Sequence, residues 1–240
     1  MSRPRLVLIS GWAYPSSAWG DTAAFLAPDW DLSIIDPRDV LDAHDSRDHG
    51  VAGRIRAAVA SRAPCIFGGW SLGGMLALEH AGSMASLVDG LLVLSSASRF
   101  CAAPDYAFGV PPSELRAMQI GIRRNRSETL GRFYARSARP AAPPPRSAEW
   151  ADETRGHDLR SGLVYLANVD LRARSGPEGL PTVVLHGDED AVIPSGAATE
   201  LAARLHCCHL DIIPGAGHDF PLRLPRKIKD GLDHIGSSSA

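Results

Sequence analysis

The 240-residue sequence has few cysteines, few aromatic residues and no excess of charge of either sign. Four cysteines, two of them adjacent (Cys207 and Cys208), are too few for a disulfide scaffold and indicate a reducing, cytoplasmic compartment. A net charge of −2 gives no overall electrostatic case for binding nucleic acid or a membrane surface. No apolar run approaches the ~20 residues of a membrane span, and the first residues lack the apolar stretch of a signal peptide.

Motifs that bind cofactors and metals are also missing. The sequence has no CxxC, HExxH, Walker or dinucleotide-binding pattern. The run His206-Cys207-Cys208-His209 contains metal-binding residue types, but it leads into a strand-like segment. Successive side chains of a strand point to opposite faces and do not converge on one ion. We therefore expect neither a metal ion nor an organic cofactor.

Six short apolar runs alternate with helix-length segments. Continuous apolar runs are typical of strands that are buried on both faces of a parallel sheet. The alternation predicts an α/β fold with right-handed crossovers and a mostly parallel sheet of about six strands. The runs are 5–10, 31–36, 64–68, 91–95, 182–186 and 210–213, and the helical segments between them include 51–63, 72–80 and 195–205.

The alternation stops between Ser95 and Thr182, where the sequence is rich in proline and arginine. Three stretches there have helical patterns: one that opens at Ser113, which we expect to be its N-cap, one over 127–138 and one over 149–169. We therefore predict a single domain, 1–240, with a helical lid inserted over about 97–180. The Gly- and Ser-rich tail 236–240 is expected to be disordered.

The pentapeptide Gly69-Trp70-Ser71-Leu72-Gly73 has the G-x-S-x-G pattern of a nucleophile elbow. It follows a predicted strand and precedes a predicted helix, which is the context that the elbow requires. Small residues flank the serine because the turn is too tight for side chains, and the helix directs its N-terminus at the serine, where negative charge would develop. Ser71 is therefore the predicted nucleophile.

A serine nucleophile needs a base, and the base needs an orienting acid. His218 lies in a glycine-rich loop directly after the last predicted strand, and His186, before the acid loop, is expected to be structural. The loop after the fifth strand offers three carboxylates, of which we choose Asp190, with Asp188 as the alternative. The chain order serine, acid, histidine is that of α/β-hydrolases.

The oxyanion hole of such a site uses two backbone N–H groups. One belongs to the residue after the nucleophile, Leu72, and the other to the loop after the first strand, where Trp12 is the predicted donor. The Trp12 indole is also expected to line the acyl pocket, although a purely structural place in the core would account for it as well.

The predicted lid is strongly basic. The segment from Ser113 to Arg146 contains two acidic residues, Glu114 and Glu128, and eight arginines, which gives it a net charge of +6. A solvated helix face would explain such a run, and so would a docking surface for an acidic partner beside the active site. Nucleic acid fits less well, because the region lacks a binding motif. The arginines are Arg116, Arg123, Arg124, Arg126, Arg132, Arg136, Arg139 and Arg146.

Three motifs together resemble the pimeloyl-acyl-carrier-protein methyl ester esterases of biotin synthesis, which are α/β-hydrolases. They are the elbow 68–74, Gly11-Trp12 followed by Trp19, and Asp170-Leu171-Arg172. Two features depart from the pattern. Ser10 stands where most α/β-hydrolases have histidine, and the sequence begins almost at the first strand, so we expect the usual N-terminal hairpin to be lacking.

The resemblance implies a serine carboxylesterase that hydrolyses the methyl ester of pimeloyl carried on acyl carrier protein, through an acyl-enzyme. The acidic carrier would then dock on Arg116, Arg123, Arg124, Arg126, Arg132 and Arg136 of the lid. The segment 132–137 resembles the family's acyl-lining segment, so Phe133, Tyr134 and Ser137 would line the substrate site together with Trp12. A small-molecule esterase, thioesterase or C–C hydrolase with the same triad remains an alternative, and so does a hydrolase-like protein that only binds a ligand.

Overall fold

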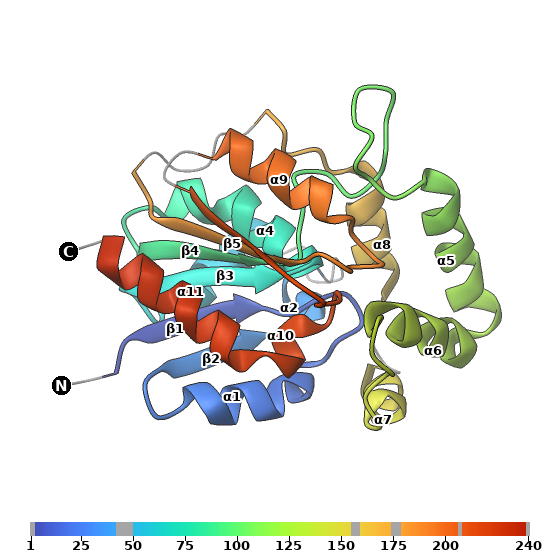
Figure 1. Ribbon diagram of the computed structural model, residues 1–240, viewed down its shortest axis with the longest axis horizontal. Coiled ribbons are helices and arrows are strands. Elements are labelled where there is room, and N and C mark those ends of the chain that lie inside the picture. The colour runs from blue at the N-terminus through green and yellow to red at the C-terminus, as the bar shows by residue number, and fades with distance from the viewer. Residues whose placement is uncertain (1–2, 42–49, 155–158, 174–178, 206–207, 239–240) are drawn as a thin grey trace.

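Six parallel strands form one sheet in the order β2-β1-β3-β4-β5-β6, which confirms the predicted six-stranded α/β architecture (Figure 1). The structure is a computed structural model, which describes residues 3–41, 50–154, 159–173, 179–205 and 208–238. All five pairings between neighbouring strands are parallel. The strands are β1 Arg5–Ile9, β2 Asp31–Ile35, β3 Cys65–Trp70, β4 Val88–Leu94, β5 Thr182–Gly187 and β6 Cys208–Ile213.

Helices cover both faces of the sheet. Figure 1 shows α1 and α11 on one face and α4 and α9 on the other. The central strands β3 and β5 are therefore buried along their whole length, as their continuous apolar runs predict. The helices around the sheet are α1 Gly20–Leu26, α2 Pro37–Leu41, α3 Gly50–Ala60, α4 Leu72–Ala81, α9 Ser195–Arg204, α10 Phe220–Arg223 and α11 Pro225–Ser238, with short 3₁₀ turns η1 Ser16–Trp19 and η2 Gly82–Met84.

The insert between β4 and β5 is helical where the structure describes it. It contains α5 Pro112–Arg124, α6 Arg126–Ser137, α7 Ser147–Glu153 and α8 Leu159–Asn168. These helices lie at one end of the sheet (Figure 1). The arrows of the strands in Figure 1 point toward this end, so it carries their carboxyl ends and the turns that follow them, including the one before Leu72. We call α5–α8 the lid.

Two local predictions were wrong. Ser113 is not an N-cap, because α5 already begins at Pro112, and proline is favourable in the first turn, where its missing N–H has no acceptor to lose. Residues 236–238 of the tail predicted to be disordered continue α11, and 239–240 lie outside the described residues. The helical content predicted over 149–169 is confirmed by α7 and α8.

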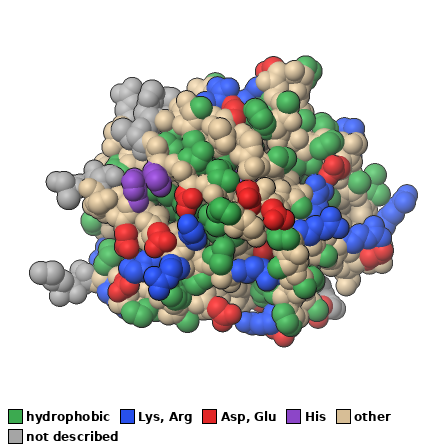
Figure 2. Space-filling view, in the orientation of Figure 1, with side chains coloured by type: hydrophobic (Ala, Val, Ile, Leu, Met, Phe, Trp, Pro, Cys, Tyr) green, Lys and Arg blue, Asp and Glu red, His purple; other side chains and the backbone are tan. Residues whose placement is uncertain are grey.

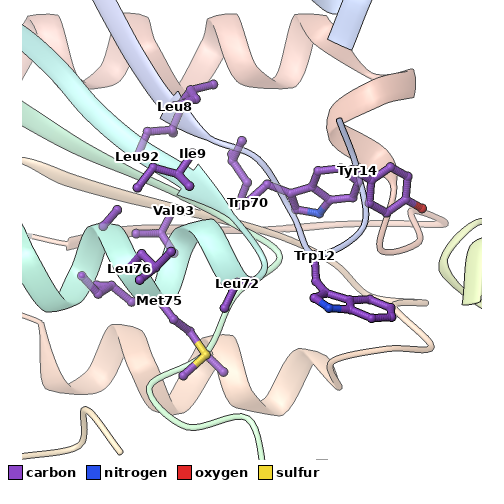
Figure 3. Close-up of a cluster of buried hydrophobic side chains, with 14 of the residues drawn as sticks. Leu8, Ile9, Trp12, Tyr14, Trp70, Leu72, Met75, Leu76, Leu92 and Val93 are labelled. Atoms are coloured by element: carbon purple, nitrogen blue, oxygen red, sulfur yellow. The ribbon is translucent and has the colours of Figure 1, made fainter. Parts of the chain in front are cut away.

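The hydrophobic core reaches from the sheet into the loop after β1 (Figure 3). Leu8 and Ile9 of β1 are fully buried, and so are the aromatic side chains of Trp70 and Tyr14 beside them. The ring centroids of Tyr14 and Trp70 are 4.3 Å apart. This packing holds the loop after β1 firmly against the end of β3. Among the described residues, no helix combines the length and the apolar character needed to cross a bilayer.

Candidate active site

Ser71 lies in a sharp turn between β3 and α4. Its backbone has φ +56° and ψ −118°, a conformation that is strained for a residue with a side chain and that tends to occur at functional sites. The neighbouring glycines make the turn possible. A Cβ atom on Gly69 would lie 2.3 Å from the backbone of Gly73, and one on Gly73 would lie 2.1 Å from the Ile9 oxygen. The turn thus has the geometry of a nucleophile elbow.

His218 and Asp190 form a buried hydrogen-bonded pair. The Nδ1 atom of His218 lies 2.7 Å from the Oδ2 atom of Asp190, and neither side chain has appreciable contact with solvent. Asp188, the alternative acid, instead accepts a hydrogen bond from the Gly215 N–H at 2.7 Å, which ties the acid loop to the histidine loop. The structure therefore places Asp190, and not Asp188, beside the imidazole.

The His218 loop is held in place by groups from two other parts of the chain. The Trp70 indole donates to the His218 carbonyl at 2.9 Å, which connects the loop to the residue before Ser71. The Asp219 N–H donates to the Ser137 carbonyl of the lid at 3.1 Å. The Nε2 atom of His218 is buried and has no hydrogen-bond partner among the described residues. That nitrogen is therefore available to a serine hydroxyl or a substrate.

The charge of the acid is strongly favoured despite its burial. Burial raises the pKa of Asp190, but His218 and a hydrogen bond from His186 outweigh it and hold that pKa well below its usual range. Two backbone N–H groups, those of Val192 and Ile193, also donate to Asp190 Oδ1 at 2.8 Å each. An ionised Asp190 is what is needed to stabilise a protonated imidazole.

The two predicted oxyanion donors come from different elements, Leu72 from the start of α4 and Trp12 from the loop after β1. Leu72 is the first residue of α4, where helix N–H groups have no intrahelical acceptor. Trp12 lies in the turn after β1, which is closed by the hydrogen bond from Tyr14 N–H to the Gly11 carbonyl at 3.2 Å. Both residues line a cavity of about 30 Å³, which also borders Asp36 and Gly162. Burial raises the pKa of Asp36.

Two of the predicted substrate residues join the lid to the loop after β1. The Tyr134 hydroxyl donates to the Ala13 carbonyl at 2.6 Å, and Ser137 accepts a hydrogen bond from the Tyr14 hydroxyl at 2.8 Å. Phe133 meets the Trp12 ring edge-on, with centroids 4.9 Å apart. Sequence reasoning missed Tyr14, although its position two residues after Trp12 was the available signal. These contacts make α6 a fixed wall of the site.

The six predicted docking arginines fall into two groups. Figure 2 shows basic side chains at the end of the molecule where α5 and α6 lie, as well as elsewhere on the same face. Within the described part of the chain, Arg116, Arg123 and Arg124 on α5 are exposed and form no ion pair. The other three are engaged: Arg126 donates to the Thr154 carbonyl, Arg132 pairs with Glu128, and Arg136 pairs with Glu114 and donates to the Ala191 carbonyl.

An apolar groove runs between α5 and α6. Its volume is about 200 Å³, and Met118 and Phe133 are among its lining residues, with Arg132 and Arg136. Phe133 also contacts Trp12, so one residue of the groove wall touches the loop after β1. Its walls are mostly apolar, as a site for an acyl chain requires.

The other motifs that the sequence analysis singled out form contacts that support loops and strands. Ser10 accepts a hydrogen bond from the Trp19 indole at 2.9 Å, so the two residues support the same loop. Asp170 pairs with Arg99 at 2.6 Å and with Arg172 at 2.7 Å, which joins the two ends of the insert. Cys208 begins β6, the strand predicted there. His206 and Cys207 lie outside the described residues.

Comparisons with known proteins agree with this geometry. A family model described as "Alpha/beta hydrolase family" matches residues 6–229. Two curated relatives, from Nitrosomonas europaea and Xanthomonas axonopodis pv. citri, are each 28% identical; the alignments cover 97% and 98% of this chain and 95% and 96% of theirs. Both are named pimeloyl-[acyl-carrier protein] methyl ester esterase, which confirms the resemblance seen in the sequence.

Solved structures have the same fold. A bromoperoxidase from Bacillus anthracis has a TM-score of 0.84 at 14% identity, over 98% of this chain and 92% of its own. An esterase from Exiguobacterium antarcticum has a TM-score of 0.79 at 17% identity, over 100% of this chain and 93% of its own. At such low identity the likeness concerns the fold alone, since one fold supports many activities.

Proposed function

This chain belongs to the alpha/beta hydrolase family, and on that premise we propose that it is a serine carboxylesterase that hydrolyses the methyl ester of pimeloyl carried on acyl carrier protein. The observation that carries the proposal is the buried pair of Asp190 and His218, 2.7 Å apart, in a chain whose elbow presents Ser71 at the same edge of the sheet. The shared name of the curated relatives supports the substrate class.

In the proposed reaction, the Ser71 hydroxyl attacks the ester carbonyl while His218 Nε2 takes its proton. Asp190 holds the other ring nitrogen and stabilises the imidazolium that forms. The tetrahedral intermediate collapses, the carbon–oxygen bond to the methoxy group breaks, and His218 returns the proton to the departing methanol. Water then attacks the acyl-enzyme by the same route and releases the free acid.

The proposed oxyanion donors are the backbone N–H groups of Trp12 and Leu72. Leu72 is the first residue of α4, so the helix dipole adds to its own N–H. The Trp12 indole is not available for this role, because it donates to the Leu159 carbonyl at 2.9 Å. That bond fixes the Trp12 ring and, with it, the direction of the loop's backbone. Preorganised donors of this kind supply a large share of the catalysis of acyl transfer.

The acyl chain and the carrier are assigned to the lid. We place the chain in the groove between α5 and α6, which ends at Phe133 beside Trp12. The carrier would dock on the exposed face of α5, where Arg116, Arg123 and Arg124 surround Ile120, a residue that is 52% exposed. Unpaired cations around an exposed apolar residue are complementary to an acidic protein surface.

The direct test is methanol release from methyl pimeloyl-acyl carrier protein, beside a short p-nitrophenyl ester at matched enzyme concentration. The proposal expects fast methanol release that leaves the free carrier-bound acid. Cleavage of only the p-nitrophenyl ester would overturn the carrier substrate and favour a small-molecule esterase. Failure to cleave either ester, with no labelling of Ser71 by a fluorophosphonate, would favour a protein that only binds a ligand.

Charge reversal on α5 should weaken carrier docking selectively. We expect Arg124→Glu to lower kcat/KM for the carrier substrate about tenfold at low ionic strength, because electrostatic steering is lost, and to leave the p-nitrophenyl ester unaffected. High salt should abolish the difference between variant and wild type.

Arg226→Glu is the matched control, since Arg226 is exposed on α11, forms no ion pair with a described residue, and gives the same change in charge. An equal loss in both variants, or an equal loss for both substrates, would contradict docking on α5 and leave the arginines as a solvated face.

A further inference from the structure

His186 lies at the end of β5, four residues before Asp190, and sequence reasoning assigned it only a structural place. Its side chain is fully buried. The Nε2 atom lies 2.8 Å from the Ile193 carbonyl oxygen and 3.3 Å from Asp190 Oδ2. A single ring nitrogen therefore contacts two residues of the loop that carries the acid, Asp190 and Ile193.

The surroundings determine which nitrogen carries the proton. A carbonyl oxygen only accepts hydrogen bonds, so Nε2 must be the donor toward Ile193. The Nδ1 atom is buried and has no hydrogen-bond partner among the described residues. A second proton there would be buried without an acceptor, which is costly. His186 is thus placed as a donor whose Nε2–H is directed to the Ile193 carbonyl, while Asp190 Oδ2 lies 3.3 Å from the same nitrogen atom.

The carboxylate of Asp190 is fully surrounded by donors. Oδ1 accepts the N–H groups of Val192 and Ile193, while Oδ2 faces His218 Nδ1 at 2.7 Å and His186 Nε2 at 3.3 Å. Two imidazole rings therefore compete for the same oxygen atom. The distances rank them, with the bond to His218 the shorter of the two.

We propose that His186 is a positioning residue, which holds Asp190 Oδ2 against His218 and limits how strongly that oxygen attracts the imidazolium. It acts through Asp190 and touches neither substrate nor nucleophile. The inference rests on the proposed function, because it assigns the base to His218. The N–H dipole of His186 stabilises the carboxylate and weakens its pull on the proton of His218.

Removal of this donor has two expected effects. In His186→Phe, Asp190 loses one of the groups that orient it, so kcat for a p-nitrophenyl ester should fall about tenfold with KM little changed. The carboxylate then acts on His218 alone, the protonated imidazole is favoured, and the acid limb of the kcat/KM profile should move to higher pH. In His186→Gln an amide N–H can reach the same oxygen atoms, so both effects should be largely reversed.

The controls separate this role from a structural one. His234→Phe, on α11, should leave the profile unchanged. An unmoved acid limb and an unchanged kcat in His186→Phe, even with a lower Tm, would overturn the proposal. So would a failure of His186→Gln, when folded, to restore the profile.

A readout that needs no turnover keeps the test independent of the proposed function. The proton between His218 Nδ1 and Asp190 Oδ2 should give a downfield signal in the proton NMR spectrum, and this signal should move further downfield in His186→Phe and return in His186→Gln. If wild type cleaves no ester but the signal moves, the proposed function fails and the positioning role stands. If esters are cleaved and the signal stays in place, the positioning role fails.

Discussion

Replacement of Ser71 by alanine should lower kcat for ester hydrolysis by about 10⁴-fold or more, as the loss of the nucleophile does in other serine hydrolases. The reason is that no other hydroxyl is placed in the turn between β3 and α4 with the N-terminus of α4 behind it. The fold should be retained, because alanine fits the same backbone and the Ser71 N–H still donates to the Leu94 carbonyl.

The measurement is the steady-state rate with a p-nitrophenyl ester, accompanied by circular dichroism and Tm. Ser127→Ala is the control, since Ser127 is exposed on α6, and it should behave as wild type. A folded Ser71→Ala variant that keeps its ester hydrolysis would reject the catalytic assignment as a whole.

Gly73→Ala should strongly destabilise the fold at the elbow. The added methyl group would lie 2.1 Å from the Ile9 oxygen and 2.5 Å from the Ser10 oxygen, and both are backbone atoms that cannot rotate away. Separating α4 from β1 should cost about 3 kcal/mol of unfolding free energy, the upper part of the range for overpacked cores. For a chain of this size that corresponds to a fall in Tm of roughly 6–12 °C.

The activity of Gly73→Ala should fall together with its stability, because displacement of α4 moves the Leu72 N–H and Ser71 away from the loop after β1. Gly131→Ala provides the comparison. Gly131 lies inside α6 with no atom within 4 Å of the added Cβ, so the exchange should raise stability by up to about 1 kcal/mol. Thermal unfolding of both variants checks the pair, and equal Tm values for Gly73→Ala and wild type would refute the steric argument.

The choice between two acids shows where sequence reasoning reached its limit. The loop after β5 offers Asp188 and Asp190, and both follow a strand that ends at the active-site edge. Chain order and residue type are the same for the two. Only the path of the folded loop, with Asp190 N–H donating to the Gly187 carbonyl at 3.3 Å, turns one carboxylate toward His218 and leaves the other to the Gly215 N–H.

The contacts of the lid arginines are of two kinds, some within one helix and some between segments far apart in the sequence. The pair Glu128–Arg132 has i,i+4 spacing on one helix, and such pairs can be recognised from the sequence. The pair Glu114–Arg136 joins two helices, and the bond from Arg136 to the Ala191 carbonyl reaches the acid loop. Neither contact has a sequence signal, so the sequence overstated the number of free arginines.

The sequence by itself determined the parallel sheet, the elbow and the order of serine, acid and histidine, because each of these follows from short-range patterns of apolar, small and turn-forming residues. The tertiary structure alone decided which acid meets His218, which arginines stay exposed on α5, and that His186 shares Asp190 Oδ2 with His218. These outcomes depend on distances of a few ångströms between segments far apart in the chain, and such distances are set by packing, not by local pattern.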